Sequence, residues 1–134
     1  MLAYRWVAIG GALGSVGRFW LNGVMSAKFG ETFPWGTIVV NVTGSFLIGL
    51  LGALTSPQGR MDPSSRAWTT QFLMLGVCGG YTTFSSFSLQ TLNLIHDREW
   101  LHAGGNVLLS VVLCLVAVWL GWVCGALFQS LKGT

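Results

Sequence analysis

Charged residues divide the chain into four long apolar runs. Three of these runs, 32–59, 67–96 and 100–131, contain no Asp, Glu, Lys or Arg. The fourth run, 6–27, is interrupted only by Arg18. A helix that crosses the hydrocarbon core of a bilayer needs about 20 residues, so each run is long enough for one crossing. The pattern predicts an all-α membrane protein with four transmembrane helices.

Tryptophans and turn-forming residues place the ends of these helices. One tryptophan lies near the first turn of each run, where amphipathic rings favour the membrane–water boundary: Trp6, Trp35, Trp68 and Trp100. The connections hold Gly, Pro and charged residues, and Asp62 followed by Pro63 is typical of a helix start. We therefore predict a single domain over residues 1–134, with spans at 4–27, 35–55, 66–96 and 100–129.

The composition agrees with this prediction and excludes other classes of protein. Of the 134 residues, 52% are hydrophobic and 8% are charged, whereas a soluble domain carries about 25% charged residues. So few charges do not suit a water-soluble enzyme. The net charge of +3 comes from scattered basic residues rather than from the cluster that nucleic-acid binding needs. The three cysteines lie inside predicted spans, without the spacing of a disulfide framework or a metal site.

The loop charges leave the orientation in the membrane open. Basic residues on the cytoplasmic side normally fix the topology of a membrane protein. Four of them fall on one side of the predicted bundle (Arg5, Arg60, Arg66 and Lys132) and two fall on the other (Lys28 and Arg98). This small excess is compatible with insertion in both orientations and with one fixed orientation.

Small residues recur at four-residue spacing in three of the spans. Such ladders let helix backbones approach closely, either within one chain or between two chains. They are Gly10 and Gly14, then Ser45, Gly49 and Ala53, then Ala117, Gly121 and Gly125. Because a lone bundle of four helices has little interior left for a polar path, we favour a homodimer.

The carboxylates are placed unfavourably for proton-coupled transport. Glu31, Asp62, Asp97 and Glu99 all lie in or beside predicted loops. A proton-coupled antiporter normally needs a titratable group inside the membrane. No Ser–His or carboxylate pair has the spacing of an intramembrane enzyme either. The open alternatives are a channel and a membrane interaction protein whose polar residues only pack helices.

Uncharged hydrogen-bonding residues lie within the spans instead. Thr37 and Asn41 are one helical turn apart in the second span, and Asn106, Ser110 and Cys114 repeat this spacing in the fourth. Such side chains either join helices by hydrogen bonds or line a path where they donate hydrogen bonds to an anion. The spacing is compatible with both.

The third span contains the segment Gly79–Ser88, GGYTTFSSFS, whose glycines and threonines have low helix propensity and disfavour a continuous helix. We predict that the helix is broken there, at mid-span. A break frees backbone carbonyls, which a membrane tolerates only where they bind a partner or line a cavity. Phe84 and Phe87 follow on roughly one helical face. Because an aromatic ring has a positive edge, two such edges beside Asn41 and several hydroxyls suit a small anion.

The sequence resembles the CrcB/Fluc family of fluoride channels. The segment 79–88 is similar to the family's GGLTTFSTFS motif, and Gly10-Gly11, Arg18 and Gly36-Thr37 with Asn41 also match the family pattern. The resemblance extends over essentially the whole chain. It implies a channel, not an enzyme, that passes fluoride selectively and passively out of the cytoplasm and so lowers its toxicity. The implied location is the bacterial inner membrane, as a multi-pass protein.

The resemblance also implies an antiparallel, dual-topology homodimer with two fluoride pathways. Phe84 and Phe87 match the phenylalanines that line those pathways. The polar residues of the pathway are matched by Asn41, Thr37, Ser110 and Ser86, with Arg18 near the vestibule. The backbone carbonyls of Gly79 and Thr82 from both subunits match the ligands of a central sodium ion (Na+), which is structural and not transported.

Three positions depart from the family pattern. Tyr81 replaces the usual Leu, and Gln90 stands where many relatives carry Glu, which removes a titratable group. Asn106 occupies a variable position where some relatives have Tyr, and it is not included among the predicted pathway residues. A paralogous second subunit in place of the homodimer is the alternative that the loop charges leave open.

Overall fold

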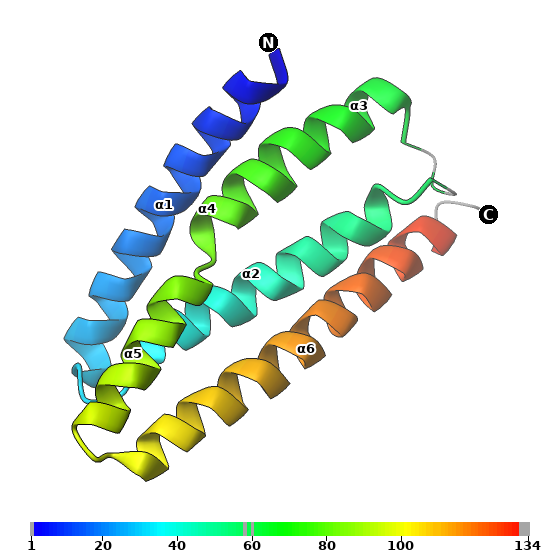
Figure 1. The fold of residues 1–134 in the computed structure, drawn as a ribbon. Coiled ribbons are helices and arrows are strands. Elements are labelled where there is room, and N and C mark those ends of the chain that lie inside the picture. Colours follow the sequence, from blue (N-terminus) through cyan, green and yellow to red (C-terminus); the bar gives the residue numbers. More distant parts are fainter. Residues whose placement is uncertain (1, 58, 60, 132–134) are drawn as a thin grey trace.

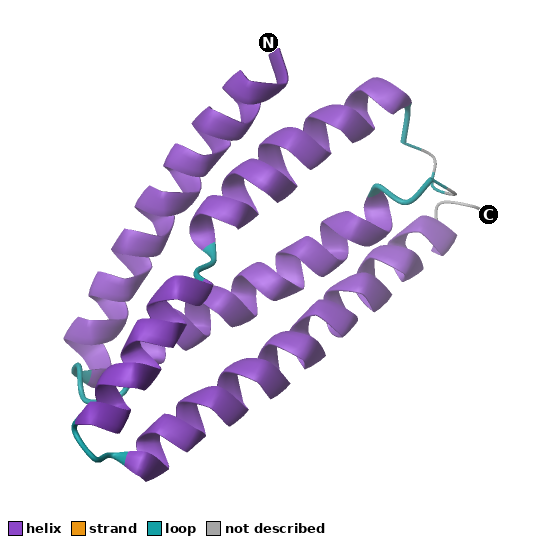
Figure 2. Ribbon diagram, in the orientation of Figure 1, coloured by secondary structure: helices purple, strands orange, loops and turns teal. Residues whose placement is uncertain are grey.

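The computed structural model describes residues 2–57, 59 and 61–131, and within them all regular structure is helical. Four long helical segments follow one another along the chain (Figures 1 and 2). They are α1 (Leu2–Phe29), α2 (Trp35–Leu54), the composite segment 63–96 and α6 (Trp100–Leu131). The composite segment consists of α3 (Pro63–Trp68), a π-helical run η1 (Thr69–Cys78), α4 (Gly79–Tyr81) and α5 (Phe84–His96).

The start of α3 agrees with the sequence prediction. Pro63 occupies the first turn, and Asp62 caps the helix by accepting hydrogen bonds from the N–H groups of Ser64 and Ser65, both at 3.0 Å. Hydrogen bonding to Ser65, through its side chain first and its main chain second, holds the pKa of Asp62 below its ordinary value. The connection between the second and third segments therefore ends at a well-defined cap.

Three of the four segments are long and apolar enough to cross a membrane: Trp35–Leu54, Pro63–His96 and Trp100–Leu131. Helix α1 is long enough, at 28 residues, but does not fall in this group. It carries Arg5, Arg18 and Lys28 along its length, which lowers its mean hydropathy. Its membrane crossing, and with it the set of four spans, stays a prediction.

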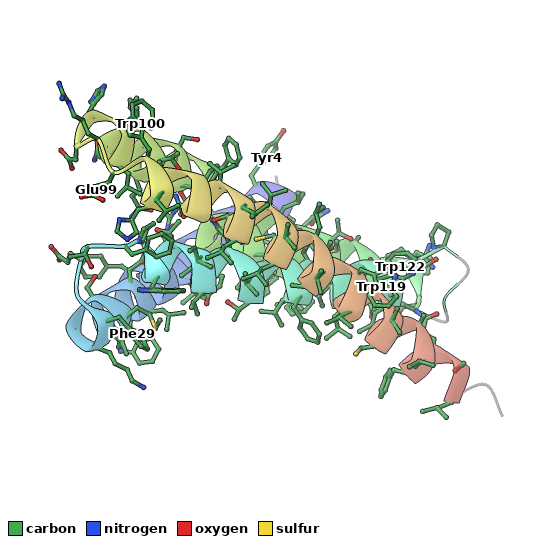
Figure 3. All side chains as sticks on the ribbon, turned by 90° about the horizontal axis from the view of Figure 1, so that it is seen from below. Tyr4, Phe29, Glu99, Trp100, Trp119 and Trp122 are labelled. Atoms are coloured by element: carbon green, nitrogen blue, oxygen red, sulfur yellow. The ribbon has the colours of Figure 1, made fainter. Side chains whose placement is uncertain are left out.

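Many large apolar side chains lie on the outside of the bundle, and most of the buried side chains are small or polar, with Ile38 and Phe87 as buried large apolar residues. Helix α1 exposes Ile9, Leu13, Val16, Phe19 and Trp20, and α6 likewise exposes Trp119 and Trp122 (Figure 3). Among the described residues, the largest side chains that are less than 2% exposed are Val40, Asn106 and Thr37. A water-soluble protein shows the opposite distribution, so this arrangement suits lipid surroundings.

The glycine ladders form contacts within this one chain. A Cβ atom on Gly14 of α1 would collide with the carbonyl oxygen of Val77 in η1. In the same way, a Cβ atom on Gly121 of α6 would collide with the carbonyl oxygen of Phe46 in α2. Since these glycines are used for packing inside the chain, the ladders alone do not argue for a homodimer.

These contacts group the helices in pairs. Helix α1 runs along η1 and α4, and α2 runs along α6, whereas α5 continues beyond α4 to lie beside α6 (Figure 1). At one end of the bundle, α1 and α5 finish while α2 and α6 begin; Phe29, Glu99 and Trp100 lie there (Figure 3). The point where α4 gives way to α5 faces α2, and this junction positions the candidate site.

Candidate functional site

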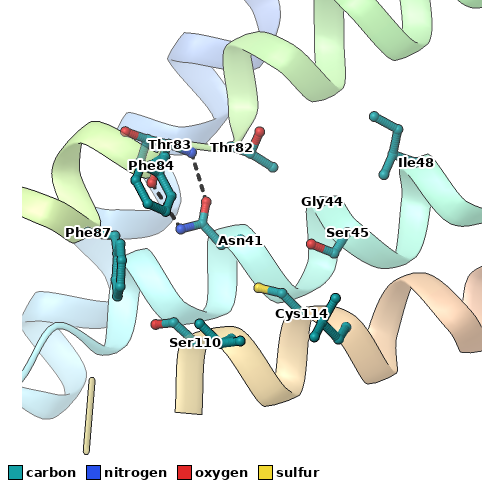
Figure 4. A pocket seen from close by; sticks show the side chains of 12 residues that line it. Asn41, Gly44, Ser45, Ile48, Thr82, Thr83, Phe84, Phe87, Ser110 and Cys114 are labelled. Carbon is teal, nitrogen blue, oxygen red and sulfur yellow. Dashed lines mark hydrogen bonds between the residues drawn. The ribbon is translucent and has the colours of Figure 1, made fainter. Parts of the chain in front are cut away.

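Between α4 and α5 the chain leaves helical geometry at Thr82 and Thr83, which we call the bend. Both residues are extended, with φ −77° and ψ 157° at Thr82 and φ −152° and ψ 113° at Thr83. Asn41 of α2 binds the bend: its Oδ1 accepts from the Thr83 N–H at 2.7 Å, and its Nδ2 donates to the Thr83 carbonyl at 3.0 Å (Figure 4). One amide therefore satisfies both backbone groups of a buried residue.

Carbonyl oxygens before the bend lose their helical donors, and those of Gly79 and Thr82 are among them. In a continuous α-helix, the N–H of Thr83 would bond to the carbonyl of Gly79, and the N–H of Ser86 would bond to the carbonyl of Thr82. The Thr83 N–H donates to the α2 amide instead. The Ser86 N–H donates to Thr83 Oγ1 at 3.1 Å, which caps α5. The carbonyls of Gly79 and Thr82 thus lack the partners that a helix would give them.

Arg18 and Ser86, both predicted pathway residues, lie at the bend and line neither of the two pockets described below. Arg18 Nη1 is 3.5 Å from the carbonyl oxygen of Thr82, the outer limit for a hydrogen bond. Ser86 Oγ accepts from Thr83 Oγ1 at 3.0 Å. Both side chains therefore contact the bend directly.

A pocket of about 370 Å³, here called the bend pocket, opens beside the bend between α2, α5 and α6 (Figure 4). Phe84 and Phe87 form its α5 side, with ring centroids 5.2 Å apart and ring planes inclined by 50°. Phe87 is buried, whereas Phe84 is 77% exposed. The other lining residues are Asn41, Gly44, Ser45, Ile48, Thr82, Thr83, Ser110, Val111, Cys114 and Leu115.

The described lining of the bend pocket offers hydrogen bonds and aromatic rings but no acidic or basic side chain. Amide, hydroxyl and thiol groups come from α2, the bend and α6, and the phenylalanine rings add their positive edges. Such a lining compensates part of an anion's lost hydration without a fixed charge that would trap it. Four predicted pathway residues meet here, Asn41, Phe84, Phe87 and Ser110, together with Thr82, which was predicted as a sodium ligand.

Ser45 and Cys114 line this pocket but are not among the predicted pathway residues. Ser45 belongs to a ladder of small residues, and Cys114 to the polar repeat of the fourth span. Each lies four residues beyond a predicted pocket residue, Asn41 for Ser45 and Ser110 for Cys114. This helical spacing was the signal that could have found both.

A second pocket of about 790 Å³, here called the end pocket, lies at the end of the bundle where α2 and α6 begin. Its lining includes three acidic residues, Glu31, Asp97 and Glu99. His102 Nδ1 lies 3.0 Å from Glu99 Oε2 in the same lining. The rest of the lining is Asn22, Ser26, Gly30, Thr32, Phe33, Pro34, Gly36, Thr37, Gln90, Asn93 and Leu94.

Thr37, another predicted pathway residue, lines the end pocket and not the bend pocket. It is 1% exposed, and its Oγ1 has no hydrogen-bond partner among the described residues. The Oε1 of Gln90 in the same pocket is likewise buried and without a partner in that part of the chain. Buried polar atoms in this condition are costly unless water or a ligand satisfies them.

Side chains in the described part of the chain form no metal site, because no three of the His, Cys, Asp and Glu residues come together. The backbone offers a different kind of ligand. Carbonyl oxygens freed from helical bonding bind alkali cations in membrane proteins. At the bend, Gly79 and Thr82 have carbonyls of this kind.

Comparison with known proteins gives consistent matches. Residues 5–122 match the model of the family described as CrcB-like protein, Camphor Resistance (CrcB). The chain is 59% identical to a protein of Opitutus terrae over 134 residues, which is 100% of both chains. It is 53% identical to one of Methylocella silvestris (97% of this chain, 98% of the relative) and 54% identical to one of Rhodospirillum rubrum (96% and 98%). Each of these three relatives is named a fluoride-specific ion channel, FluC.

Proposed function

Because the chain belongs to the CrcB-like protein family, we propose that it is a fluoride-selective ion channel and not an enzyme. The names of its relatives support this function over the whole length of the chain. The observation that carries the proposal is the bend pocket, where two phenylalanine rings and several uncharged donors converge without an acidic or basic residue in the described lining.

We assign the fluoride pathway to the phenylalanines Phe84 and Phe87 and to the polar residues Asn41, Thr37, Ser86, Ser110 and Arg18. The amide of Asn41 has two N–H groups, of which one is used on the Thr83 carbonyl, so the other remains for an anion. Ring edges and hydroxyls replace further water molecules of the ion. Since none of the groups in the bend pocket is charged, binding stays weak enough for release.

A second subunit is part of the proposal because the bend pocket is incomplete in one chain. Phe84 belongs to the pocket lining, but the residue as a whole is 77% exposed. An antiparallel copy of the chain would cover this side and form two pathways, one for each bend pocket. The small excess of basic loop residues on one side is compatible with insertion in both orientations, and the four spans 4–27, 35–55, 66–96 and 100–129 make up one subunit.

A structural sodium ion at the dimer interface belongs to the same proposal. The carbonyls of Gly79 and Thr82 fit such an ion, because the bend at mid-span removes their helical donors. When bound, the ion would hold the two bends together by its charge. It would not be transported.

The direction of transport follows from the chemistry of fluoride. Neutral HF crosses membranes from an acidic medium, dissociates in the more alkaline cytoplasm and leaves fluoride behind. A passive channel in the bacterial inner membrane lets this fluoride leave down its electrochemical gradient. Proton coupling is not needed, which agrees with the position of all four carboxylates outside the predicted spans.

The first experiment is fluoride efflux from liposomes that contain the purified chain, recorded with a fluoride electrode. With valinomycin and potassium present to clamp the voltage, we expect rapid fluoride release and little chloride release. The same liposomes without protein are the control. Absence of fluoride release from an assembled dimer would overturn the proposed homodimeric channel and direct attention to a paralogous subunit.

The second candidate function is helix packing alone, and the hydrogen bonds of Asn41 to the bend favour it. The variants Phe84→Ile and Phe87→Ile separate the two. The channel proposal expects fluoride efflux to fall to background while size-exclusion chromatography still shows the dimer. The matched control is Phe19→Ile, because Phe19 is 82% exposed on α1 and lines neither pocket. Loss of assembly in both pocket variants would favour the packing function.

A further inference from the structure

Arg66 of α3 is half-buried and holds its guanidinium at the edge of the bundle. Its Nη2 donates to the carbonyl of Met61 at 3.2 Å, and its Nε is buried without a hydrogen-bond partner among the described residues. Its Nη1 forms no hydrogen bond to that part of the chain and is not one of its buried unsatisfied atoms, so it reaches the molecular surface. Since a guanidinium has five N–H groups, Arg66 is fixed on its inner side and offers free donors on its outer side.

No carboxylate in the described part of the chain balances the charge of Arg66. Three of the four acidic residues line the end pocket, which lies at the opposite end of the bundle, because the segment 63–96 runs from α3 to that pocket (Figure 1). The fourth, Asp62, lies four residues before Arg66, but it accepts the main-chain hydrogen bonds that cap α3 and forms no ion pair with Arg66. A half-buried positive charge without an acidic partner in its own chain is best balanced by an anion from outside.

Aromatic rings mark the depth of Arg66 in the membrane. Trp68, two residues further along the chain, stacks on Phe72 with ring centroids 5.0 Å apart. Trp6 of α1 contacts both rings, with centroid distances of 6.1 Å to Trp68 and 5.8 Å to Phe72. Trp68 is 40% exposed, and half-exposed indole rings at the end of an apolar segment favour the membrane–water boundary. Arg66 therefore lies at the level of the lipid headgroups, where phosphate is the most abundant anion.

We propose that Arg66 binds the headgroup phosphate of an anionic phospholipid at this end of the bundle. Two parallel N–H groups of a guanidinium match two oxygens of a phosphate, which makes arginine a selective phosphate ligand. Arg5, next to Trp6 in the sequence, is exposed and adds a second positive charge at the same end. Basic residues near the membrane surface favour anionic lipids. The lipid is thus held by its phosphate at Arg66 and selected for its negative charge by both arginines.

Native mass spectrometry of the purified chain in detergent measures this binding directly. Phosphatidylglycerol is the anionic probe, and phosphatidylcholine with the same acyl chains is the zwitterionic one. We expect the apparent dissociation constant of phosphatidylglycerol to be lower by about fivefold, the weight of one basic residue at a membrane surface. Equal binding of the two lipids would overturn the proposal. Displacement of phosphatidylglycerol by an equal concentration of inorganic phosphate would also overturn it, because the site would then bind a free anion.

The variant Arg66→Gln removes the charge and the paired N–H groups of the guanidinium. We expect the affinity for phosphatidylglycerol to fall by about tenfold, the weight of one charge-assisted hydrogen bond. The matched control is Arg98→Gln, which removes a positive charge beside Asp97 and Glu99 at the opposite end of the bundle and should leave the affinity unchanged. Wild-type affinity in assembled Arg66→Gln protein, or an equal loss in the control, would contradict a site at Arg66.

The variant Arg66→Lys, together with the wild-type comparison of the two lipids, decides the question if Arg66→Gln does not assemble. Lysine keeps the positive charge but has no planar pair of N–H groups. We expect the preference for phosphatidylglycerol over phosphatidylcholine to persist, while the affinity falls by about threefold, the weight of one hydrogen bond. Unchanged affinity in this variant would refute the role of the guanidinium. These measurements record lipid binding and not fluoride efflux, so their outcome is independent of the proposed channel function.

Discussion

The two halves of the segment 63–96 are held in the bundle by different kinds of contact. The first half, 63–81, packs its backbone directly against α1: the contact at Gly14 is so close that it leaves no room for a methyl group. The second half, α5 with the bend before it, is held by side-chain hydrogen bonds from Asn41 and Asn106. The first half relies chiefly on close backbone packing, although Ser15 and Thr43 also form hydrogen bonds with it, whereas the second half relies on polar side chains.

The two kinds of contact correspond to two roles: the first half is structural, and the second half borders the pockets. Backbone packed on backbone excludes water and ligands, and neither described pocket borders the contact between Gly14 and η1. Hydrogen-bonded side chains keep α5 at a greater distance, and both pockets lie along it. Polar contacts can exchange partners with an ion, whereas glycine contacts cannot. We therefore expect substitutions in the first half to affect folding and substitutions in the second half to affect transport as well.

The largest effect is expected from Gly14→Ala. The added methyl group collides with the Val77 carbonyl and lies 2.8 Å from the backbone nitrogen of Tyr81, neither of which can turn aside. We expect a loss of about 3 kcal/mol in the free energy of unfolding, measured by denaturant titration in detergent micelles. In the same helix, Gly23→Ala meets nothing within 4 Å and is the control; it should stabilise α1 by up to about 1 kcal/mol. Equal effects of the two variants would contradict the proposed scaffold.

The second largest effect on the free energy of unfolding is expected from Asn41→Leu. Leucine leaves the N–H and carbonyl of Thr83, a residue that is 6% exposed, without their partners. Unfolding should become easier by about 2 kcal/mol, the cost of burying unsatisfied polar groups. Hydrogen exchange at the Thr83 amide should accelerate, while the amides of η1 keep their protection. Uniform acceleration along 63–96 would show that the two halves are not independent.

A smaller effect is expected from Tyr81→Phe at the end of the first half. The hydroxyl of Tyr81 lies 2.9 Å from Thr43 Oγ1, and since Thr43 donates to the Val39 carbonyl at 2.7 Å, Tyr81 is the donor of this bond. Its removal should cost about 1 kcal/mol of unfolding free energy and leave fluoride efflux unchanged. The double variant Tyr81→Phe, Thr43→Val should cost no more than the sum of its parts. A strong loss of efflux would place Tyr81 in the pathway.

The smallest effect concerns the start of the first half, where Asp62 caps α3. Hydrogen bonds to Ser65 lower the pKa of Asp62 below the ordinary value of 3.8. Because the folded pKa is the lower one, the cap stabilises α3 above the ordinary pKa, and the stabilisation is lost as the pH falls through the folded pKa. The midpoint of the pH titration of the Ser65 amide shift should therefore lie below pH 3.8. A midpoint at or above this value would contradict the cap.

Much of this arrangement could be predicted from the sequence, because local chemistry determines it. Asp62 followed by Pro63 predicted the start of α3, and charges and tryptophans bounded the helical segments. Helical spacing marked Asn41 and Ser110 as polar positions inside the spans, and both line the bend pocket, although the spacing left open whether they line a path or pack helices. These features depend on neighbours within one or two helical turns.

Other features depend on contacts that spacing does not determine. The glycine ladders could have joined two chains, and only the packed structure shows Gly14 against η1 and Gly121 against α2. The partner of Asn106 was equally hidden, since Thr91 lies on another helix and nothing in the local sequence selects it. The π-helical run η1 has no sequence signal that we can identify. Tertiary packing, rather than local preference, decides these points.

The bend also has an electrostatic consequence. The peptide dipoles of a helix leave partial negative charge at its carboxyl end and partial positive charge at its amino end. At Thr82 and Thr83 the carboxyl end of one helical run stands next to the amino end of another. A segment without any Asp, Glu, Lys or Arg from residue 67 to residue 96 therefore carries two poles of opposite sign in its interior. A cation and an anion would each find a pole of suitable sign there, a few residues apart, without a single charged side chain being buried.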